Sequence, residues 1–441
     1  MGDLGKEFVK YFVILGLILI LEPKIAADEY DTIHDVTNYG AVGDGITDDT
    51  KAFESAWEAA CTSGSSNSVI VPTGEFLVSR IVFQGPCKFT SLSFQILGKI
   101  VAPPRSKWRK TVEHEWLYFH NVDGLNVTGN GQGVIHGNGL SWWSTGVRPT
   151  ALRFSHCHGL TVSGLKHVDS QRNHISINEC NNVIITNLHI VAPILSPNTD
   201  GIDVIGSTDL LILDSIIETG DDCIAINGGT SRVNITRIAC GPGHGISIGS
   251  LGKDGRYDQV EAISVSNCSF RGTKNGVRIK TWQGGSGFAR RINFSDINFD
   301  AAYNPVIIDQ YYCPHETCNI QKSAVKVSDV KYVRLSGTSM SKGATINFSC
   351  SQTVPCTDIL IEDVHIVPID QEPPSVQCIN AQISLPVVQG TRLPITSNDA
   401  ATTAAAMNLQ HNLAKIQADA MPGHYEAELD LEINDFPQNA R

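Results

Sequence analysis

Three polar residues recur at one interval in the middle of the chain. Residues Asp200, Asp222 and His244 are separated by two equal steps, 200 to 222 and 222 to 244, and Asp221 stands beside the second. If successive segments fold as stacked coils, these side chains occupy equivalent positions about 4.8 Å apart. Neighbouring carboxylates repel one another, which raises one pKa and lets an acid and a base coexist. Hydrolysis of a glycosidic bond requires such a pair.

Two cations are expected beside these carboxylates. In the segment Gly276-Val-Arg-Ile-Lys280 the apolar residues alternate with Arg278 and Lys280, so a strand here turns both cations away from the core. An arginine binds a carboxylate through two parallel hydrogen bonds, and a lysine adds a point charge. The formal net charge is −12, so the surface as a whole repels polyanions. We therefore expect no nucleic-acid partner, and an acidic substrate would need this local positive charge.

Each motif also has a plain structural interpretation. An Asp-Asp pair often marks a turn, Gly243-His-Gly245 fits a tight loop, and alternating cations are common on solvated strands. A calcium site is another alternative for an acidic cluster. The neighbouring Arg278 and Lys280 argue against a bound cation, so the sequence predicts no metal and no cofactor.

Short apolar strands must position these residues. One series of alternating segments begins at residues 174, 201, 223, 245 and 276, in steps of 27, 22, 22 and 31, and a second series lies between them. Irregular repeats of this length, rich in β-branched residues and broken by Asn and Gly, indicate a solenoid. We predict an all-β, single-domain right-handed parallel β-helix of about ten coils. A β-sandwich is the alternative, but its strands need no register repeated from coil to coil.

The two ends of the chain differ from the repeats. Residues 48–60 have helical periodicity and are predicted to form an N-terminal helix that caps the first coil, with Ala52, Phe53, Ala56, Trp57 and Ala60 on one side. We expect the β-helix catalytic domain to span residues 28–385. Residues 386–441 lose the strand alternation and are predicted to be an atypical tail, partly helical or disordered.

The first 27 residues are predicted to be a cleaved signal peptide. Lys6 and Lys10 precede an apolar run, which is followed by Pro23 and the small pair Ala26 and Ala27. A membrane anchor is the alternative, but the run from residue 11 to 21 is shorter than the roughly 20 residues of a spanning helix. We therefore expect a secreted protein with no membrane anchor after cleavage.

Secretion would expose the cysteines to an oxidising compartment. Close spacing favours three disulfides, although connectivity is not readable from sequence: Cys223 with Cys240, Cys313 with Cys318, and Cys350 with Cys356. We expect Cys157, Cys180 and Cys268 to be buried free thiols. Five Asn-X-Ser/Thr triplets agree with a glycoprotein, at Asn126, Asn234, Asn267, Asn293 and Asn347.

Four stretches together carry a specific resemblance: 196–203 (SPNTDGID), 219–223 (TGDDC), 240–250 (CGPGHGISIGS) and 275–281 (NGVRIKT). On these motifs the chain resembles a plant-type polygalacturonase of glycoside hydrolase family 28, from about Asp35 to Cys378. The tail from about Gln382 departs from the usual ending of that family, and Cys378 lacks an evident partner.

The resemblance implies a role for each matching residue. Asp221 would be the general acid, with Asp200 and Asp222 holding and deprotonating a water. His244 would support the acid. The implied substrate-binding residues are Arg278, Lys280, Tyr311 and Asn198. The family inverts the anomeric configuration without a metal, which predicts roughly 6.5–9.5 Å between the acid and base carboxyl groups.

The resulting prediction is a monomeric polygalacturonase of the extracellular region and cell wall. It would hydrolyse α-1,4 bonds between galacturonic acid residues of pectin, with endo and exo attack both open. A protein that binds pectin without cleaving it is the alternative from another class. The presence of every signature residue favours the enzyme.

Overall fold

The computed structural model describes most of the chain between residues 32 and 384. The described ranges exclude residues 64–66, 89–90, 109–113, 315–317, 342–343 and 371–374, and beyond 384 only the backbone of 395–397 is described. The predicted signal segment 1–27 and nearly all of the predicted tail 386–441 therefore lie outside the described residues.

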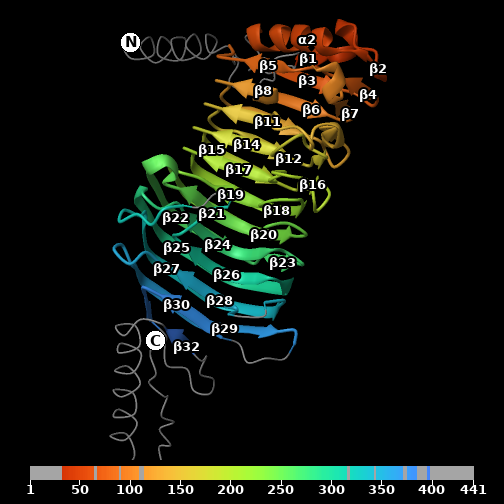
Figure 1. The fold of residues 1–441 in the computed structure, drawn as a ribbon. Coiled ribbons are helices and arrows are strands. Elements are labelled where there is room, and N and C mark those ends of the chain that lie inside the picture. The colour runs from red at the N-terminus through yellow and green to blue at the C-terminus, as the bar shows by residue number, and fades with distance from the viewer. Residues whose placement is uncertain are drawn as a thin grey trace, which may run out of the picture. The chain divides into compact units, whose positions relative to one another are not determined.

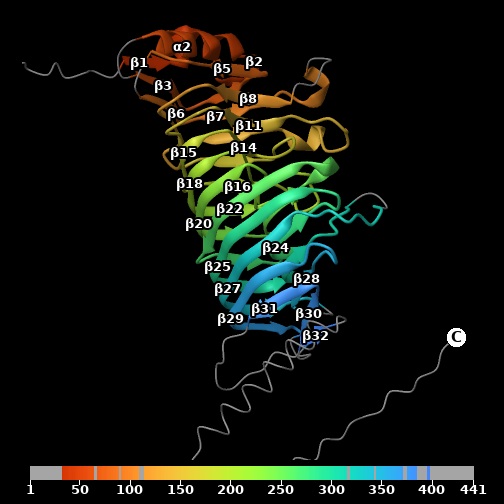
Figure 2. The ribbon, with the colours of Figure 1, turned by 90° about the vertical axis from the view of Figure 1, so that its left-hand side faces the viewer.

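Parallel strands form two sheets, and successive coils of the chain contribute strands to both (Figures 1 and 2). The twelve-stranded sheet carries the residues of interest. In spatial order its strands are β5 (Ile81–Gln84), β8 (Glu115–His120), β11 (Thr150–Ser155), β14 (Ile175–Asn178), β17 (Ile202–Ile205), β19 (Ile224–Ile226), β21 (Ile246–Leu251), β24 (Asn275–Thr281), β26 (Asn304–Asp309), β28 (Ile346–Ser349), β30 (Val376–Ile379) and β32 (Ile395–Ser397).

The twenty-stranded sheet forms the rest of the coil walls. Its strands, within the described residues, are β1 (Thr32–Asp35), β2 (Asp44–Asp48), β3 (Asn67–Val71), β4 (Glu75–Leu77), β6 (Leu92–Ile96), β7 (Lys99–Val101), β9 (Leu125–Thr128), β10 (Val134–His136), β12 (Thr161–Ser163), β13 (Lys166–Val168), β15 (Asn181–Thr186), β16 (His189–Val191), β18 (Thr208–Glu218), β20 (Thr230–Cys240), β22 (Tyr257–Ser266), β23 (Ser269–Arg271), β25 (Ser286–Ala302), β27 (Lys326–Ser339), β29 (Cys356–Pro368) and β31 (Ala381–Ser384). Short 3-10 turns cover 36–39, 105–107, 139–141 and 253–255.

The predicted right-handed parallel β-helix is confirmed. We expected about ten coils. The twelve-stranded sheet, to which each coil contributes one strand, has twelve strands within the described residues. The coils that begin at residues 81 and 115 precede the series read from the sequence, and the next strand of this sheet starts at 150. These coils are longer than the regular ones, which hides the repeat in the sequence.

Side chains stacked in register form the core. Ile202, Ile224, Ile246 and Val277 are paired from strand to strand, and all four are buried. Near the N-terminal end, the ring of Phe119 is stacked on Phe83 at 4.4 Å and on Phe154 at 5.2 Å between centroids. The alternation read from the sequence therefore does place its apolar residues inward, because successive side chains of a strand point to opposite faces.

A helix covers the first coil, as predicted. Helix α2 spans Thr50–Thr62 rather than 48–60, and it buries all five predicted apolar residues together with Cys61. It starts later because Asp48 ends strand β2 and accepts a hydrogen bond from the Thr50 amide at 3.0 Å, while Asp49 accepts one from the Val42 amide of the preceding loop at 2.7 Å. None of the helices within the described ranges is long and apolar enough to cross a membrane.

All three predicted disulfides are present, and the predicted free thiols are buried. Cys378 is also a buried free thiol. A fourth disulfide joins Cys61 to Cys87, 26 residues apart. Its spacing gave no reason to pair these two residues, because the contact depends on how α2 packs on the coil beneath it. The bond ties the end of the capping helix to the β-helix.

The stacked rings predict a large cost for truncation. Replacing the buried Phe119 by Ala should destabilise the protein by about 3–5 kcal/mol, because the cavity removes ring contacts in two directions. The measurement is the midpoint of chemical denaturation followed by circular dichroism. Leu195→Ala, at a residue that is 90% exposed, is the control and should change the midpoint little. Equal shifts in the two variants would contradict this account of the core.

Candidate active site

The register of the twelve-stranded sheet brings the predicted residues together. Asp200 lies two residues before β17, Asp222 two before β19 and His244 two before β21. The Gly201 amide donates to the Asp222 carbonyl at 2.9 Å, and the Cys223 amide to the Gly245 carbonyl at 2.8 Å. The equal steps in the sequence therefore correspond to equivalent positions in three adjacent coils. We call the outer face of this sheet the site face.

Asp222 is the most enclosed member of the cluster. Its carboxylate is buried, and both oxygens are occupied: Arg278 Nη2 donates to Oδ1 at 2.7 Å and Lys280 Nζ to Oδ2 at 2.7 Å. Ser247 Oγ donates to Oδ1 at 2.9 Å and in turn accepts from Arg278 Nε at 2.9 Å. Burial opposes the charge of Lys280, yet Asp222 keeps the pKa of that ammonium above its ordinary value. Two cations thus compensate one buried anion.

Asp221 makes a separate set of contacts. Its Oδ1 lies 2.9 Å from His244 Nδ1 and accepts a hydrogen bond from the Asp222 amide at 2.9 Å. Its Oδ2 accepts a longer bond of 3.4 Å from Asn198 Nδ2. Burial is the largest single influence and acts to raise the pKa of Asp221, but the hydrogen bond and charge of His244, the charge of Lys280 and the Asp222 amide together leave that pKa below its ordinary value.

Asp200 differs from both neighbours. Burial, followed by the charges of Asp203, Asp221 and Asp222, raises the pKa of Asp200 well above its ordinary value. Burial also raises the pKa of Asp203 to about 7, and Asn173 Nδ2 donates to Asp203 Oδ2 at 2.7 Å. The cluster therefore combines carboxyl groups that hold a proton with groups that stay ionised, which is the division of roles that acid and base catalysis needs.

Comparison with known proteins agrees with this geometry. Residues 61–389 match the family model described as glycosyl hydrolases family 28. The chain belongs to this family. It is 52% identical to a probable polygalacturonase of Arabidopsis thaliana, over 75% of this chain and 73% of the relative. It is 45% identical to a polygalacturonase of Malus domestica, over 75% of this chain and 74% of the relative.

A solved structure supports the same assignment. The endo-xylogalacturonan hydrolase of Aspergillus tubingensis superposes with a TM-score of 0.72 at 25% identity, covering 83% of this chain and 99% of that one. The protein is thus a glycoside hydrolase of family 28 with a parallel β-helix fold.

The geometry also bears on the calcium alternative. One ligand atom from each of Asp221, Asp222 and His244 lies within 4.8 Å of the others, so these three side chains could approach one ion. Both oxygens of Asp222 are already hydrogen-bonded to cationic side chains, however. A divalent cation would have to displace Arg278 or Lys280 and would then stand beside the remaining positive charge. The donor set therefore fits a cation poorly.

Two carboxyl groups of the cluster approach each other closely. A carboxyl oxygen of Asp221 lies within 4.8 Å of one of Asp222, whereas an inverting pair was expected at roughly 6.5–9.5 Å. The two residues are adjacent in sequence, and both side chains lie in the same cluster on the site face. The separation rule therefore cannot be used to infer inversion from this pair.

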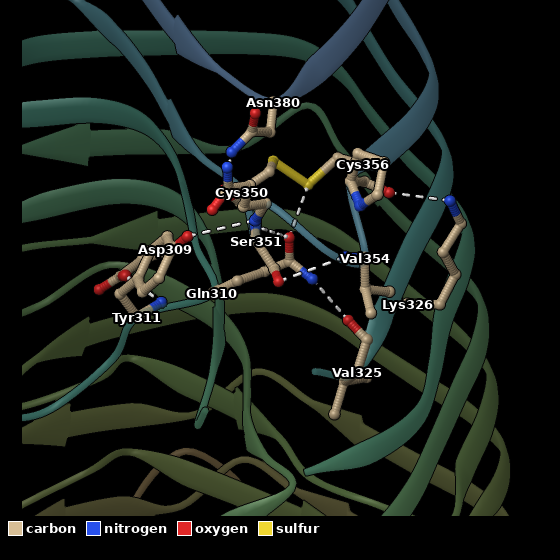
Figure 3. Close-up of a disulfide and its surroundings, with 12 residues drawn as sticks. Asp309, Gln310, Tyr311, Val325, Lys326, Cys350, Ser351, Val354, Cys356 and Asn380 are labelled. Atoms are coloured by element: carbon tan, nitrogen blue, oxygen red, sulfur yellow. Dashed lines mark hydrogen bonds between the residues drawn. A yellow bond between two sulfur atoms is a disulfide. The ribbon is translucent and has the colours of Figure 1, made fainter. Parts of the chain in front are cut away.

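Tyr311 is held by the segment that the Cys350–Cys356 disulfide closes (Figure 3). The buried Gln310 accepts from the Ser351 amide at 2.8 Å and donates to the Val325 carbonyl at 2.7 Å. The Tyr311 hydroxyl accepts from the Gln352 amide at 3.3 Å. The neighbouring Tyr312 is the one that contacts the cluster, with its ring 5.4 Å from Lys280 Nζ. The role of Tyr311 in substrate binding stays a prediction.

Sequence reasoning missed Arg148. This largely buried side chain donates from Nη2 to Asn198 Oδ1 at 2.7 Å, and from Nη1 to the carbonyls of Gln171, at 3.2 Å, and of Pro197. A guanidinium only donates, so it holds the amide oxygen of Asn198 and leaves the amide nitrogen directed at Asp221. Arg148 stands about 50 residues before the motif that it orients, and no local pattern singles it out.

The raised pKa of Asp203 predicts a pH-dependent stability. A carboxyl whose pKa is higher in the folded state stabilises the fold below its unfolded pKa of about 4, and that stability is lost as pH rises toward 7. The melting temperature should therefore fall between about pH 5 and about pH 8 at constant ionic strength. The melting temperature of the Asp203→Asn variant should fall less over this pH range than that of the wild type.

Asp209→Asn is the matched control. Asp209 forms an exposed pair with Arg232, which holds the pKa of Asp209 below its ordinary value. The Asp209 carboxyl is ionised in both the folded and the unfolded state over this pH range. The melting temperature of Asp209→Asn should therefore fall with pH as steeply as that of the wild type. If the melting temperature of Asp203→Asn fell with pH as steeply as that of the wild type, Asp203 would not hold the proton assigned to it in the folded state.

Proposed function

We propose that this protein is a secreted polygalacturonase of the cell wall that hydrolyses α-1,4 bonds between galacturonic acid residues of pectin, with inversion at the anomeric carbon. The observation that carries the proposal is the cluster of Asp200, Asp221 and Asp222 with two cations on the site face. Relatives named as polygalacturonases, 52% and 45% identical, support the substrate.

Asp221 serves as the general acid. It is the carboxyl of the cluster that pairs with His244, and the pair can hold one proton between atoms 2.9 Å apart. In the free protein His244 favours the ionised form of Asp221. A negatively charged sugar arriving beside Asp221 favours the neutral form, because like charges raise the pKa of a carboxyl. The proton then passes to the glycosidic oxygen as the bond breaks.

Asp222 and Asp200 hold and deprotonate the attacking water. The hydrogen bonds from Arg278, Lys280 and Ser247 hold the Asp222 carboxylate in one orientation. Asp222 accepts the proton that the water loses, and Asp200, whose raised pKa favours its protonated form, holds the water by hydrogen bonding. The two carboxyls thus divide the roles of proton acceptor and water-binding group.

Substrate recognition falls to the cations and amides around the cluster. Arg278 retains N–H groups beyond those bound to Asp222 and Ser247, so it can reach a sugar carboxylate. Lys280 is only 8% exposed and acts mainly by sustaining the charge of Asp222 and the positive potential. Asn198, held by Arg148, completes the binding set with Tyr311.

The cellular setting follows from the predicted signal segment and from the substrate. Polygalacturonate is a polyanion of the cell wall, so an enzyme acting on it must leave the cell. We propose that the mature protein acts there as a monomer, without a membrane anchor, nucleic-acid partner or cofactor.

Proton NMR of polygalacturonate during digestion tests the proposal in one measurement. New reducing ends should appear, and the first-formed anomer should be β, because an α linkage is inverted. Asp221→Asn should reduce the rate at least about a hundredfold, since general acid catalysis contributes on that order. Absence of new reducing ends would reject the enzyme, and a first-formed α anomer would reject the roles given to Asp200 and Asp222.

Lys280→Ala should impair chemistry as well as binding. Removing the ammonium 2.7 Å from Asp222 Oδ2 leaves one oxygen of that buried carboxylate without its charged hydrogen-bond donor. We expect kcat/KM on polygalacturonate to lose about 1.5–3 kcal/mol of transition-state stabilisation, with kcat falling as well as KM rising. Lys331→Ala, at an exposed lysine of β27 on the other sheet, is the control. A rise in KM alone would show that Lys280 binds sugar without supporting Asp222.

A further inference from the structure

A row of outward-facing positions extends along the site face beyond the cluster. Strand pairing aligns one residue from each of six neighbouring strands, and in β11, β17 and β24 the residues on either side are buried, which turns the row away from the core. The row consists of Arg153, Ser176, Asp203, Ala225, Ser247 and Arg278. Arg278 and Arg153 are the cations at its two ends, and Asp203 is the one carboxylate of the row between them. Ser176, Ala225 and Ser247 are buried.

The positive charge of Arg153 is only partly neutralised by its neighbours. Its guanidinium lies 5.4 Å above the ring of Tyr118, the aligned residue of β8, and 4.0 Å from Glu115. Glu115 is closer to Arg80, at 3.4 Å. Two guanidinium groups therefore share one carboxylate, which leaves a positive charge. The Nε of Arg153 is buried without a hydrogen-bond partner within the part of the chain that the structure describes.

Arginines elsewhere on the coils are paired differently. Arg232 donates to both oxygens of Asp209 at 2.6 and 2.7 Å, and Arg334 does the same to Asp296 at 2.6 and 2.8 Å. Such two-point pairs satisfy the guanidinium fork. Arg153 has no comparable bond among the described residues, although its side chain is 29% exposed. A purely structural ion pair accounts for Arg232 and Arg334 but not for Arg153.

We propose that Arg153, with Tyr118 beneath it, forms a distal subsite that binds the carboxylate of a galacturonate residue about three sugars from the bond that is cut. This rests on the proposed function. Arg153 lies three strands from Ala225, which follows Asp222 in the same coil, a distance of about 14 Å at about 4.8 Å per strand. One sugar of a linear polysaccharide is comparable in length to one coil, so a chain laid along the row brings a carboxylate to each level.

Chain length provides the test, because a trimer that is being cut places at most two sugars on either side of the bond and cannot reach this subsite. Arg153→Gln should lower kcat/KM for hexagalacturonate about tenfold, as expected for one lost charge-assisted hydrogen bond, and leave trigalacturonate unchanged. Arg232→Gln, which removes a cation from the other sheet, should change neither. A loss of equal size on both substrates, or no loss on either, overturns the subsite.

A binding measurement separates this inference from the proposed function. Titration calorimetry of hexagalacturonate uses an Asp221→Asn background, so that no substrate is consumed. Adding Arg153→Gln should raise Kd about tenfold, while Arg153→Lys should restore part of the affinity. If the wild type cuts no galacturonate, the proposed function fails, and the calorimetry still decides the subsite. An unchanged Kd in Arg153→Gln overturns it.

Discussion

The register between stacked coils is the constraint on which everything else depends. Backbone amides of one coil donate to carbonyls of the adjacent coil, as from Gly201 to Asp222 and from Cys223 to Gly245. A slip of one residue would reverse every side chain between core and surface. The ladder of buried side chains at Ile202, Ile224 and Ile246 prevents that slip. The same apolar ladder therefore fixes where Asp200, Asp222 and His244 stand.

Burying ionised carboxylates on the site face lowers the stability of the fold, and their hydrogen-bond partners within the cluster offset that loss. A buried carboxylate without partners would be protonated or would destabilise the fold. Asp222 avoids this with Arg278, Lys280 and Ser247, and Asp221 with His244 and Asn198. Among the described residues no cation forms a hydrogen bond or ion pair with the Asp200 carboxyl, and burial raises its pKa instead. The three carboxyls thus differ in chemistry because their partners differ, although their backbone positions are nearly equivalent.

These differences explain what could be predicted from the sequence. The fold was predictable because period-two alternation and coil-length spacing are local features, and Asp200, Asp222 and His244 inherit their alignment from that spacing. Arg148, the Cys61–Cys87 disulfide and the pairing of Lys280 with Asp222 were not, because each depends on loop paths and side-chain directions between distant segments.

A stacked register also explains how a protein with net charge −12 can accept a polyanion. Long-range repulsion from surface carboxylates is screened within about 8–10 Å in physiological salt. Contact energies on the site face therefore decide binding. There the repeated coils present a different residue at each level, with cations at Arg153 and Arg278 and the carboxyl of Asp203 between them. The positive charges at both ends of the row can hold an acidic chain, while the raised pKa of Asp203 reduces repulsion between them. A fold that repeats its backbone without repeating its side chains can thereby assign binding and bond cleavage to separate levels of one surface.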